Sequence, residues 1–242
     1  MSPGSILPLR LESVEYRVRN RLLLDSITAT LAPGTRTVIL GPNGAGKSLL
    51  LRICHGVLRC TRGRVAWESG AHDPDVRARQ AMLFQRPVLL RRSAAANVAY
   101  ALALRGVPRA ERAARVRAVL ETTGLAALAR RPARRLSGGE QQRLALARIW
   151  ALRPEIVFLD EPTASLDPGA TRAVEAVIGD MHAAGTKIVL TTQDMGQARR
   201  MADEILFLHR GRLLEATPAE RFFAAPCSDA AGAFLRGELL EG

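Results

Sequence analysis

The residues with the clearest chemical potential form a glycine-rich loop that ends in a lysine and a serine. Positions 41–48, with the sequence GPNGAGKS, fit the pattern G-x-x-x-x-G-K-[ST]. Glycines let successive backbone N–H groups turn inward around an anion, which the start of a helix also favours. In such a loop Lys47 would reach the β- and γ-phosphates of a nucleoside triphosphate, and the Ser48 hydroxyl would be a ligand of Mg²⁺. The predicted nucleotide contacts are Gly41, Pro42, Asn43, Gly44, Ala45, Gly46, Lys47, Ser48 and Leu49.

The setting of this loop favours phosphate binding over a plain glycine-rich turn with a surface lysine. The apolar run 37–40, with β-branched residues at 37–39, predicts a buried strand before the loop. The apolar run 48–53 predicts the first turns of a helix after it. A strand, a loop and a helix in this order are the context that phosphate binding requires.

Two adjacent carboxylates, Asp160 and Glu161, form the second candidate reactive group. They end the apolar run that begins at residue 156, which predicts a buried strand, and ligands collect at the carboxyl ends of parallel strands. Asp160 is predicted to serve the Mg²⁺ shell. Glu161 faces the other side by strand alternation and is predicted to polarise a water molecule. Gln85 follows the predicted strand 81–84 and is placed at the same kind of edge.

Capping patterns mark the starts of three predicted helices. Ser137 and Glu140 have the spacing of a capping box, and glycines 138 and 139 would let free N–H groups approach an anion. The alternative is simply a well-capped helix. Asp167 precedes a proline and could equally be only an N-cap. Residues 194 and 197 predict another capping box.

The candidate residues require an α/β framework to position them. The segment 93–152 is almost wholly helical in pattern and is predicted to be an insertion between sheet strands. We therefore expect one domain over 1–242: residues 1–92 and 153–242 form a β subdomain plus a nucleotide-binding core, and 93–152 a helical subdomain. The predicted fold is a phosphate-loop NTPase core with a parallel sheet, an N-terminal antiparallel β subdomain and an inserted α-helical subdomain. The predicted strands are 9–18, 22–31, 37–40, 63–67, 81–84, 156–161, 187–192, 205–208 and 212–214.

Composition narrows the classes of partner. The net charge is +12, and of 35 basic residues only Lys47 and Lys187 are lysines, which leaves 33 arginines. This skew is more typical of a codon-composition bias than of a selected binding face. No aromatic residue interleaves with the dense arginine cluster at 130–135, so the sequence argues against nucleic-acid binding and favours a surface near anionic lipid headgroups.

Cysteines and histidines lack metal-ligand spacing. No apolar run is long enough to span a bilayer and the N-terminus lacks signal-peptide features, so a cytosolic protein is expected.

The order of these motifs resembles the ATPase subunit of ATP-binding-cassette (ABC) transporters over essentially the whole chain. The motifs are GPNGAGKS, FQRP, LSGGEQQR, IVFLDEP and SLD, of which LSGGEQQR is the most specific. The resemblance implies a homodimer that sandwiches two ATP molecules head to tail. The resemblance implies that Ser137, Gly138, Gly139 and Gln141 contact ATP held by the second copy and that Asp167 faces the other subunit. It implies that Glu161 is the general base and that Asp160 and Ser48 serve Mg²⁺. Gln85 would touch Mg²⁺ and the water while sensing the membrane partner.

Two positions need separate comment. Tyr16 could pack on the sheet or stack on an adenine ring, and the resemblance favours stacking. The switch residue of the family is normally a histidine within T-H-D, whereas this chain has Gln193 between Thr192 and Asp194. A glutamine amide can donate a hydrogen bond to phosphate but carries no charge. We therefore expect slow but real hydrolysis, with a catalytically weak ATP-dependent clamp as the alternative.

The resemblance also implies partners and a location. It predicts a separate integral membrane permease and, indirectly, a periplasmic or lipid-anchored solute-binding protein, with the chain cytoplasmic and peripheral on the inner face of the membrane. Segments 194–203 and 233–239 resemble ATPases of bacterial tungstate importers, which implies import of an inorganic oxyanion such as tungstate. Alternatives are importers of molybdate, phosphate or amino acids, and a non-transport ABC ATPase acting on nucleic acid.

Overall fold

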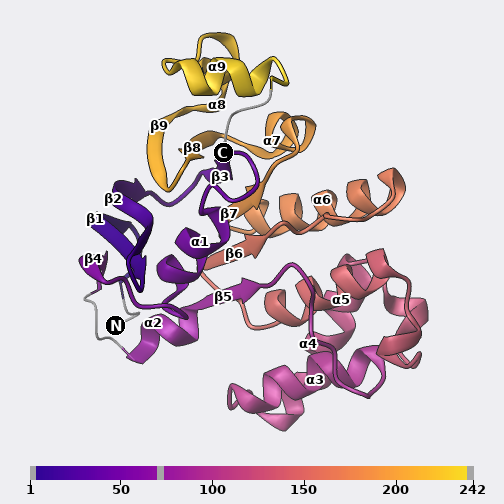
Figure 1. Cartoon of the computed structure of the whole chain (residues 1–242). Coiled ribbons are helices and arrows are strands. Elements are labelled where there is room, and N and C mark those ends of the chain that lie inside the picture. The colour runs from indigo at the N-terminus through magenta and orange to yellow at the C-terminus, as the bar shows by residue number, and fades with distance from the viewer. Residues whose placement is uncertain (1–3, 70–73, 239–242) are drawn as a thin grey trace.

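Two β-sheets organise the chain, as the computed structural model of residues 4–69 and 74–238 shows (Figure 1). The smaller sheet is antiparallel, with strand order β2-β1-β4. The larger sheet has the order β5-β6-β7-β3-β8-β9; its first five strands are parallel, and β9 runs antiparallel to β8. The strand bounds are β1 Leu9–Val18, β2 Arg21–Leu31, β3 Arg36–Leu40, β4 Arg62–Trp67, β5 Gln80–Leu83, β6 Ile156–Asp160, β7 Lys187–Thr192, β8 Glu204–His209 and β9 Arg212–Pro218.

Helices surround the larger sheet and form a separate lobe. Helices α3, α4 and α5, together with two short 3₁₀ turns, lie between β5 and β6 in the chain and form the lobe at the lower right of Figure 1. This confirms the predicted helical character of 93–152 and the predicted fold class. The helix bounds are α1 Lys47–His55, α2 Pro74–Arg79, α3 Ala94–Leu104, α4 Arg109–Thr122, α5 Gly138–Trp150, α6 Pro168–Ala183, α7 Met195–Met201, α8 Ala219–Ala224 and α9 Asp229–Leu235.

The larger sheet separates two apolar cores. Successive side chains of a strand point to opposite faces, so Val38 and Leu40 of β3 join the core shared with the helical lobe, whereas Ile39 joins the core shared with the small sheet. Strands β6 and β7 are buried along their whole length, as expected for parallel strands covered on both faces. The phosphate loop therefore leaves β3 at a point that packing fixes from both sides.

Some local predictions are confirmed and others are wrong. The predicted capping box of Ser137 and Glu140 is confirmed: each side chain accepts a hydrogen bond from the backbone N–H of the other residue. At α7, the Asp194 side chain accepts from the N–H groups of Gly196 and Gln197, as a capping box requires. The return bond from the Gln197 side chain to Asp194 is missing, because that side chain turns away from the cap, so this part of the prediction is wrong. The Gln197 amide instead donates to the hydroxyl of Thr163 at 2.7 Å, a tertiary contact that no local pattern indicates.

Candidate functional site

The glycine-rich loop is held between backbone segments of both sheets. Gly41 has φ +153°, and a Cβ there would lie 2.1 Å from the carbonyl oxygen of Leu208 on β8. Gly46, the N-cap of α1, has φ +100°, and a Cβ there would lie 2.7 Å from Leu24 Cδ2 on β2. Glycine is required at both positions because of this close approach and the left-handed backbone. The loop conformation is therefore set by its neighbours as well as by its own sequence.

The Lys47 ammonium group points back into the loop. Its Nζ donates to the carbonyl oxygens of Gly41 at 2.7 Å and Pro42 at 2.9 Å. Burial lowers the pKa of Lys47, and the charges of Glu161 and Asp160 oppose that shift. The loop thus presents a positive charge whose position is defined by backbone atoms. This charge lies at the N-terminal end of α1, which also favours anions.

The Asp160 carboxylate joins three elements at the carboxyl edge of the large sheet. Its Oδ1 accepts from Ser48 Oγ of α1 at 2.7 Å and from Thr191 Oγ1 of β7 at 3.0 Å. Its Oδ2 lies 3.6 Å from Arg52 Nη2. The side chain is only 3% exposed, so this buried charge is stabilised by two hydroxyls and a guanidinium.

Glu161 follows in a left-handed conformation, with φ +45°. Its backbone N–H donates to Thr191 Oγ1 at 3.0 Å, and its Oε2 accepts from Gln85 Nε2 at 3.1 Å. The residue borders a cavity of about 230 Å³ whose other lining residues are Asn43, Gly44, Ala45, Gly46, Lys47, Ser48 and Leu49. A carboxylate beside a phosphate-sized loop is placed to accept a proton from a water molecule there.

Gln193 does not line the cavity of the phosphate loop but shares a neighbouring one with Glu161. This second cavity, of about 250 Å³, is lined by Glu161, Thr163, Ala164, Ser165, Leu166, Thr171, Thr192, Gln193, Asp194 and Gln197. Gln193 itself is exposed. Of the predicted catalytic residues, Glu161 and Gln193 therefore border one space, with Glu161 between it and the loop.

Other candidate residues lie outside both cavities. Ser137 Oγ accepts from the Glu140 N–H at 3.3 Å, Glu140 Oε2 accepts from the Ser137 N–H at 2.7 Å, and Gln141 Nε2 donates to the Leu136 carbonyl at 2.8 Å. Asp167 caps α6 by accepting from the Ala170 N–H at 2.9 Å. Within one chain, these residues are not brought to the phosphate loop.

Tyr16 also lies outside the loop cavity, on β1 of the small sheet. It is half-buried, packs against the core of that sheet and is paired in register with Leu24 of β2. The Leu24 side chain lies close to Gly46 of the loop. Tyr16 is therefore on β1, the strand next to the one that packs against the loop.

Thr191 is a site residue that the sequence analysis missed. It lies opposite Asp160 in the parallel register of β6 and β7 and bonds both to that carboxylate and to the N–H of Glu161. The strand 187–192 was predicted, but its position beside β6 was not. Only that adjacency could have indicated the role of Thr191.

The oxygen atoms of Ser48, Asp160 and Gln85 suit a hard divalent cation. Mg²⁺ is usually bound by one or two carboxylates, with water and substrate phosphates completing its shell. Among residues 4–69 and 74–238, no group of three or more His, Cys, Asp or Glu side chains could hold a metal ion alone. The three protein oxygens fit a cation whose remaining ligands are water and phosphate oxygens.

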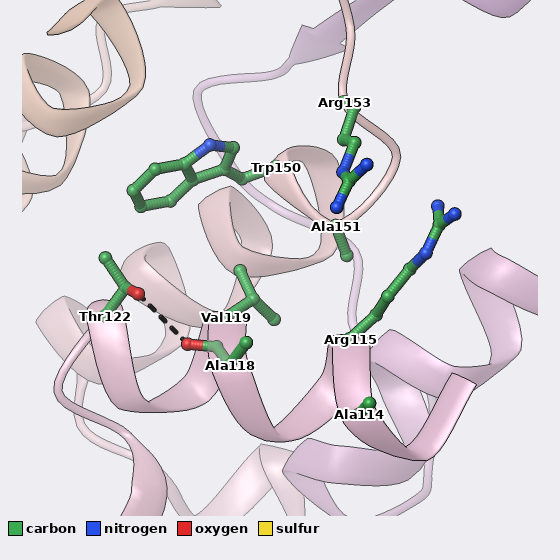
Figure 2. Close-up of a pocket in the computed structure, with 8 residues that line it drawn as sticks. All are labelled: Ala114, Arg115, Ala118, Val119, Thr122, Trp150, Ala151 and Arg153. Carbon is green, nitrogen blue, oxygen red and sulfur yellow. Dashed lines mark hydrogen bonds between the residues drawn. The ribbon is translucent and has the colours of Figure 1, made fainter. Parts of the chain in front are cut away.

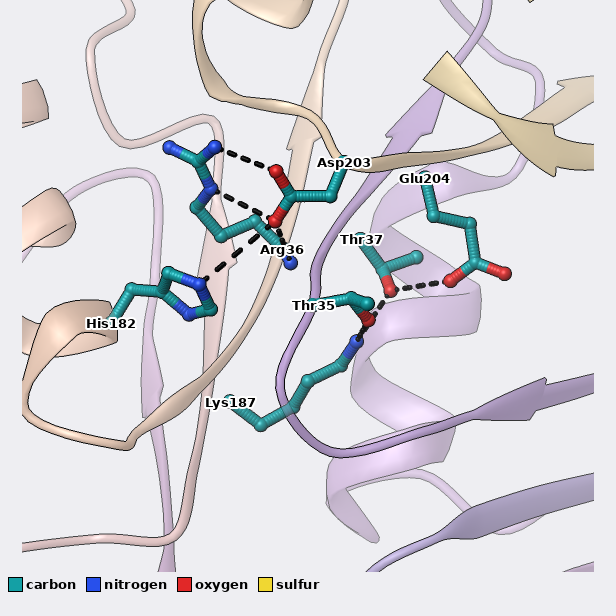
Figure 3. Close-up of polar contacts among 7 residues, drawn as sticks. All are labelled: Thr35, Arg36, Thr37, His182, Lys187, Asp203 and Glu204. Atoms are coloured by element: carbon teal, nitrogen blue, oxygen red, sulfur yellow. Dashed lines mark hydrogen bonds and ion pairs between the residues drawn. The ribbon is translucent and has the colours of Figure 1, made fainter. Parts of the chain in front are cut away.

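Two other features of the molecule lie away from this site. A hollow of about 350 Å³ is formed between α4 and the end of α5; the Trp150 ring lies on one side, with the guanidinium groups of Arg115 and Arg153 on the other (Figure 2). At the amino ends of β3, β7 and β8, Lys187 Nζ donates to Thr35 Oγ1 at 2.6 Å and Thr37 Oγ1 at 2.7 Å (Figure 3). No helix within the described ranges is long and apolar enough to cross a membrane.

Comparisons with known proteins agree on one family. A family model described as ABC transporter matches residues 24–164. The chain is 42% identical to the tungstate uptake system ATP-binding protein TupC of Peptoclostridium acidaminophilum, over 80% of this chain and 91% of the relative. It is 34% identical to the phosphate import ATP-binding protein PstB 2 of Natronomonas pharaonis, over 96% of this chain and 87% of the relative. The solved structure of cbiO1 from Clostridium perfringens, part of the ABC transporter complex cbiONQ, matches with a TM-score of 0.83 at 28% identity and 90% coverage of each chain.

Proposed function

The chain belongs to the ABC transporter family, and on this premise we propose that it is the ATPase of an importer whose membrane permease is a separate chain. One observation carries the proposal: the Ser48 hydroxyl of the phosphate loop bonds to Asp160, and the adjacent Glu161 borders the cavity of that loop. Phosphate-binding groups and a candidate general base thus form one site, although they come from distant parts of the chain.

In the proposed mechanism the loop orients the triphosphate. The N–H groups of positions 41–48 and the Lys47 ammonium group would bind the β- and γ-phosphates. Ser48, Asp160 and Gln85 would hold Mg²⁺, whose chemistry when bound is to offset negative charge on the phosphate oxygens. Tyr16 would stack on the adenine ring from the neighbouring small sheet.

Glu161 is the proposed general base. A water oxygen attacks the γ-phosphorus, the bond to the ADP oxygen breaks, and the water proton passes to the Glu161 carboxylate. The hydrogen bond from Gln85 Nε2 and the bond from the Glu161 N–H to Thr191 orient this residue. Gln193, across the second cavity, would orient water and the γ-phosphate through its amide without supplying charge.

We propose that a second copy of the chain completes the site. Ser137, Gly138, Gly139, Gln141 and Asp167 lie outside the two cavities next to the loop. In a head-to-tail dimer, the capped start of α5 would meet the γ-phosphate bound by the other copy, where its N–H groups favour an anion. Closure of the dimer over ATP would then move a permease bound to it, placing the chain on the inner face of the membrane.

The proposed cargo is an inorganic oxyanion, with tungstate as the specific proposal. Its support is the similarity to a tungstate uptake protein at 42% identity, and a relative of comparable coverage is named for phosphate import. The ATPase would not touch the cargo, which an associated solute-binding protein would deliver to the permease.

ATP turnover of the purified chain, alone and with its permease, tests the proposal. Glu161→Gln should lower kcat at least about a hundred-fold, the scale of general-base catalysis, while keeping nucleotide affinity and favouring an ATP-bound dimer. Glu121→Gln, at an exposed position on α4, is the matched control and should turn over normally. Failure to bind ATP, or to co-purify with a permease, would contradict the assignment; uptake of phosphate but not tungstate would contradict only the cargo.

A further inference from the structure

Six arginines come together on two adjoining segments, and we call this surface the arginine face. The segments are joined by a β-bridge between Ser93 and Pro132. The Ala94 N–H donates to the Arg131 carbonyl and the Ala133 N–H to the Arg92 carbonyl, both at 2.9 Å. This pairing brings residues about forty positions apart side by side. The members of the arginine face are Arg91, Arg92, Arg130, Arg131, Arg134 and Arg135.

The charge of the arginine face is not neutralised within the described part of the chain. All six side chains are exposed, and none forms an ion pair with a described carboxylate. Across residues 84–136 there are twelve arginines and only two acidic residues, Glu111 and Glu121. Glu111 is already paired with Arg115. Like charges gathered in this way repel one another, so the surface is suited to an anionic partner.

Neighbouring side chains distinguish between classes of anionic partner. Val88, three positions before Arg91 in the chain, is 77% exposed. Arg92 lies over the Tyr100 ring at 5.1 Å, so one face of this ring is already covered and is not free for base stacking. Exposed apolar side chains beside arginines suit the boundary between lipid headgroups and acyl chains.

We propose that the arginine face binds an anionic phospholipid bilayer directly. The guanidinium groups would contact headgroup phosphates, and Val88 would lie at the level of the acyl-chain boundary. This contact requires neither nucleotide nor permease. Its test is therefore independent of the proposed transport function.

Vesicle sedimentation of the purified chain tests this proposal. Binding should be strong to phosphatidylcholine vesicles that contain phosphatidylglycerol, weak to pure phosphatidylcholine, and should fall with added salt. Replacing Arg91, Arg130, Arg131 and Arg134 by glutamine should weaken binding roughly six-hundred-fold, because each basic residue near an anionic surface contributes roughly fivefold. ATP turnover should stay unchanged.

A matched variant separates the arginine face from net charge. Arg17, Arg21, Arg59 and Arg62 are also exposed and lie on or next to the small sheet, so their replacement by glutamine removes the same charge elsewhere. This control should bind vesicles like the wild type. Equal loss in both variants would overturn the proposal in favour of non-specific attraction. Unchanged vesicle binding of the first variant would also overturn it; loss of RNA binding or of permease co-purification in that variant would then identify a different partner.

Discussion

The Ser48 hydroxyl donates a 2.7 Å hydrogen bond to the Asp160 carboxylate, although 112 positions separate the two residues. This bond joins the first turn of α1 to the end of β6. Thr191 on β7 donates to the same Asp160 oxygen, so three elements meet at one atom. Because the carboxylate is buried, a change in any of these partners is expected to affect both folding and the proposed chemistry.

Thr191→Val should reduce both stability and turnover. It leaves the Glu161 N–H without its acceptor and Asp160 with one hydroxyl donor fewer, at a cost of about 1–3 kcal/mol in the free energy of unfolding. The kcat for ATP should fall more than KM changes, because the affected carboxylates act on water and metal. Thr186→Val is the control: its buried hydroxyl donates to the Pro154 carbonyl at 3.1 Å, far from the site. The Thr186→Val variant should lose stability but keep its kcat. Chemical denaturation and steady-state kinetics of both variants measure these effects. A normal kcat in Thr191→Val would exclude the role assigned to Thr191.

Gly138→Ala and Gly139→Ala should separate ligand binding from packing. A Cβ at Gly139 would lie 2.6 Å from the Cβ of Ala170, so alanine there forces α5 away from α6. A Cβ at Gly138 meets nothing nearer than Leu166 Cδ2 at 3.6 Å. We expect Gly139→Ala to lower Tm, whereas Gly138→Ala folds normally, with the better helix propensity of alanine favouring it.

Turnover of Gly138→Ala then reports on the second copy. If the start of α5 meets the γ-phosphate of the other subunit, the added methyl group should lower kcat and ATP-dependent dimerisation without lowering Tm. Size-exclusion chromatography with ATP, in the Glu161→Gln background, measures the dimer. Unimpaired dimerisation and turnover would remove Gly138 from the proposed contact.

Gln193→His should accelerate ATP turnover, and Gln193→Ala should slow it. Histidine can carry a positive charge toward the charge that develops in the transition state, whereas glutamine supplies only a neutral amide. Single-turnover and steady-state rates, measured beside Glu161→Gln, place each variant on one scale. If Gln193→Ala matches the wild type while Glu161→Gln abolishes hydrolysis, Gln193 has no catalytic role.

Lys187 should make the stability of the protein rise with pH. Burial lowers its pKa from 10.5 to about 8, with the charges of Glu204 and Asp203 opposing the shift. Between these two values the unfolded chain binds more protons than the native one, so the free energy of unfolding increases with pH. The Lys187 contribution is thus fully present above pH 10.5 and is lost as pH falls through 8. Over this pH range the Lys187 contribution to the free energy of unfolding changes by about 3 kcal/mol.

Comparison with Lys187→Met isolates this effect. Burial raises the pKa of Cys54 to about 12, which lowers stability above its ordinary value of 9.0 in both proteins. The difference in free energy of unfolding between wild type and variant cancels that opposing trend. Urea unfolding at a series of pH values should show the difference moving in favour of the wild type from pH 8 upward. A difference that does not vary with pH would contradict the buried, low-pKa lysine.

Much of the fold follows from patterns that are local in the chain. The β1 strand has the predicted bounds, and β2 and β6 differ from prediction by one residue at one end, because apolar runs and turn residues carry that information over a few positions. The Ser137 capping box is likewise a matter of four consecutive residues. Helix α9 was not anticipated, and the side chain of Gln197 was assigned to a cap that it does not join.

The sequence by itself determined which residues can do chemistry here: the glycine loop with Lys47 and Ser48, and the carboxylate pair at 160–161. These signals depend on residue type and short spacing, which any single chain displays. The tertiary structure alone decided which of them meet, because strand order is set by packing across the whole sheet and not by neighbouring residues. It placed β7 beside β6 and so made Thr191 part of the site, and it joined residues 93 and 132 and so assembled the arginine face.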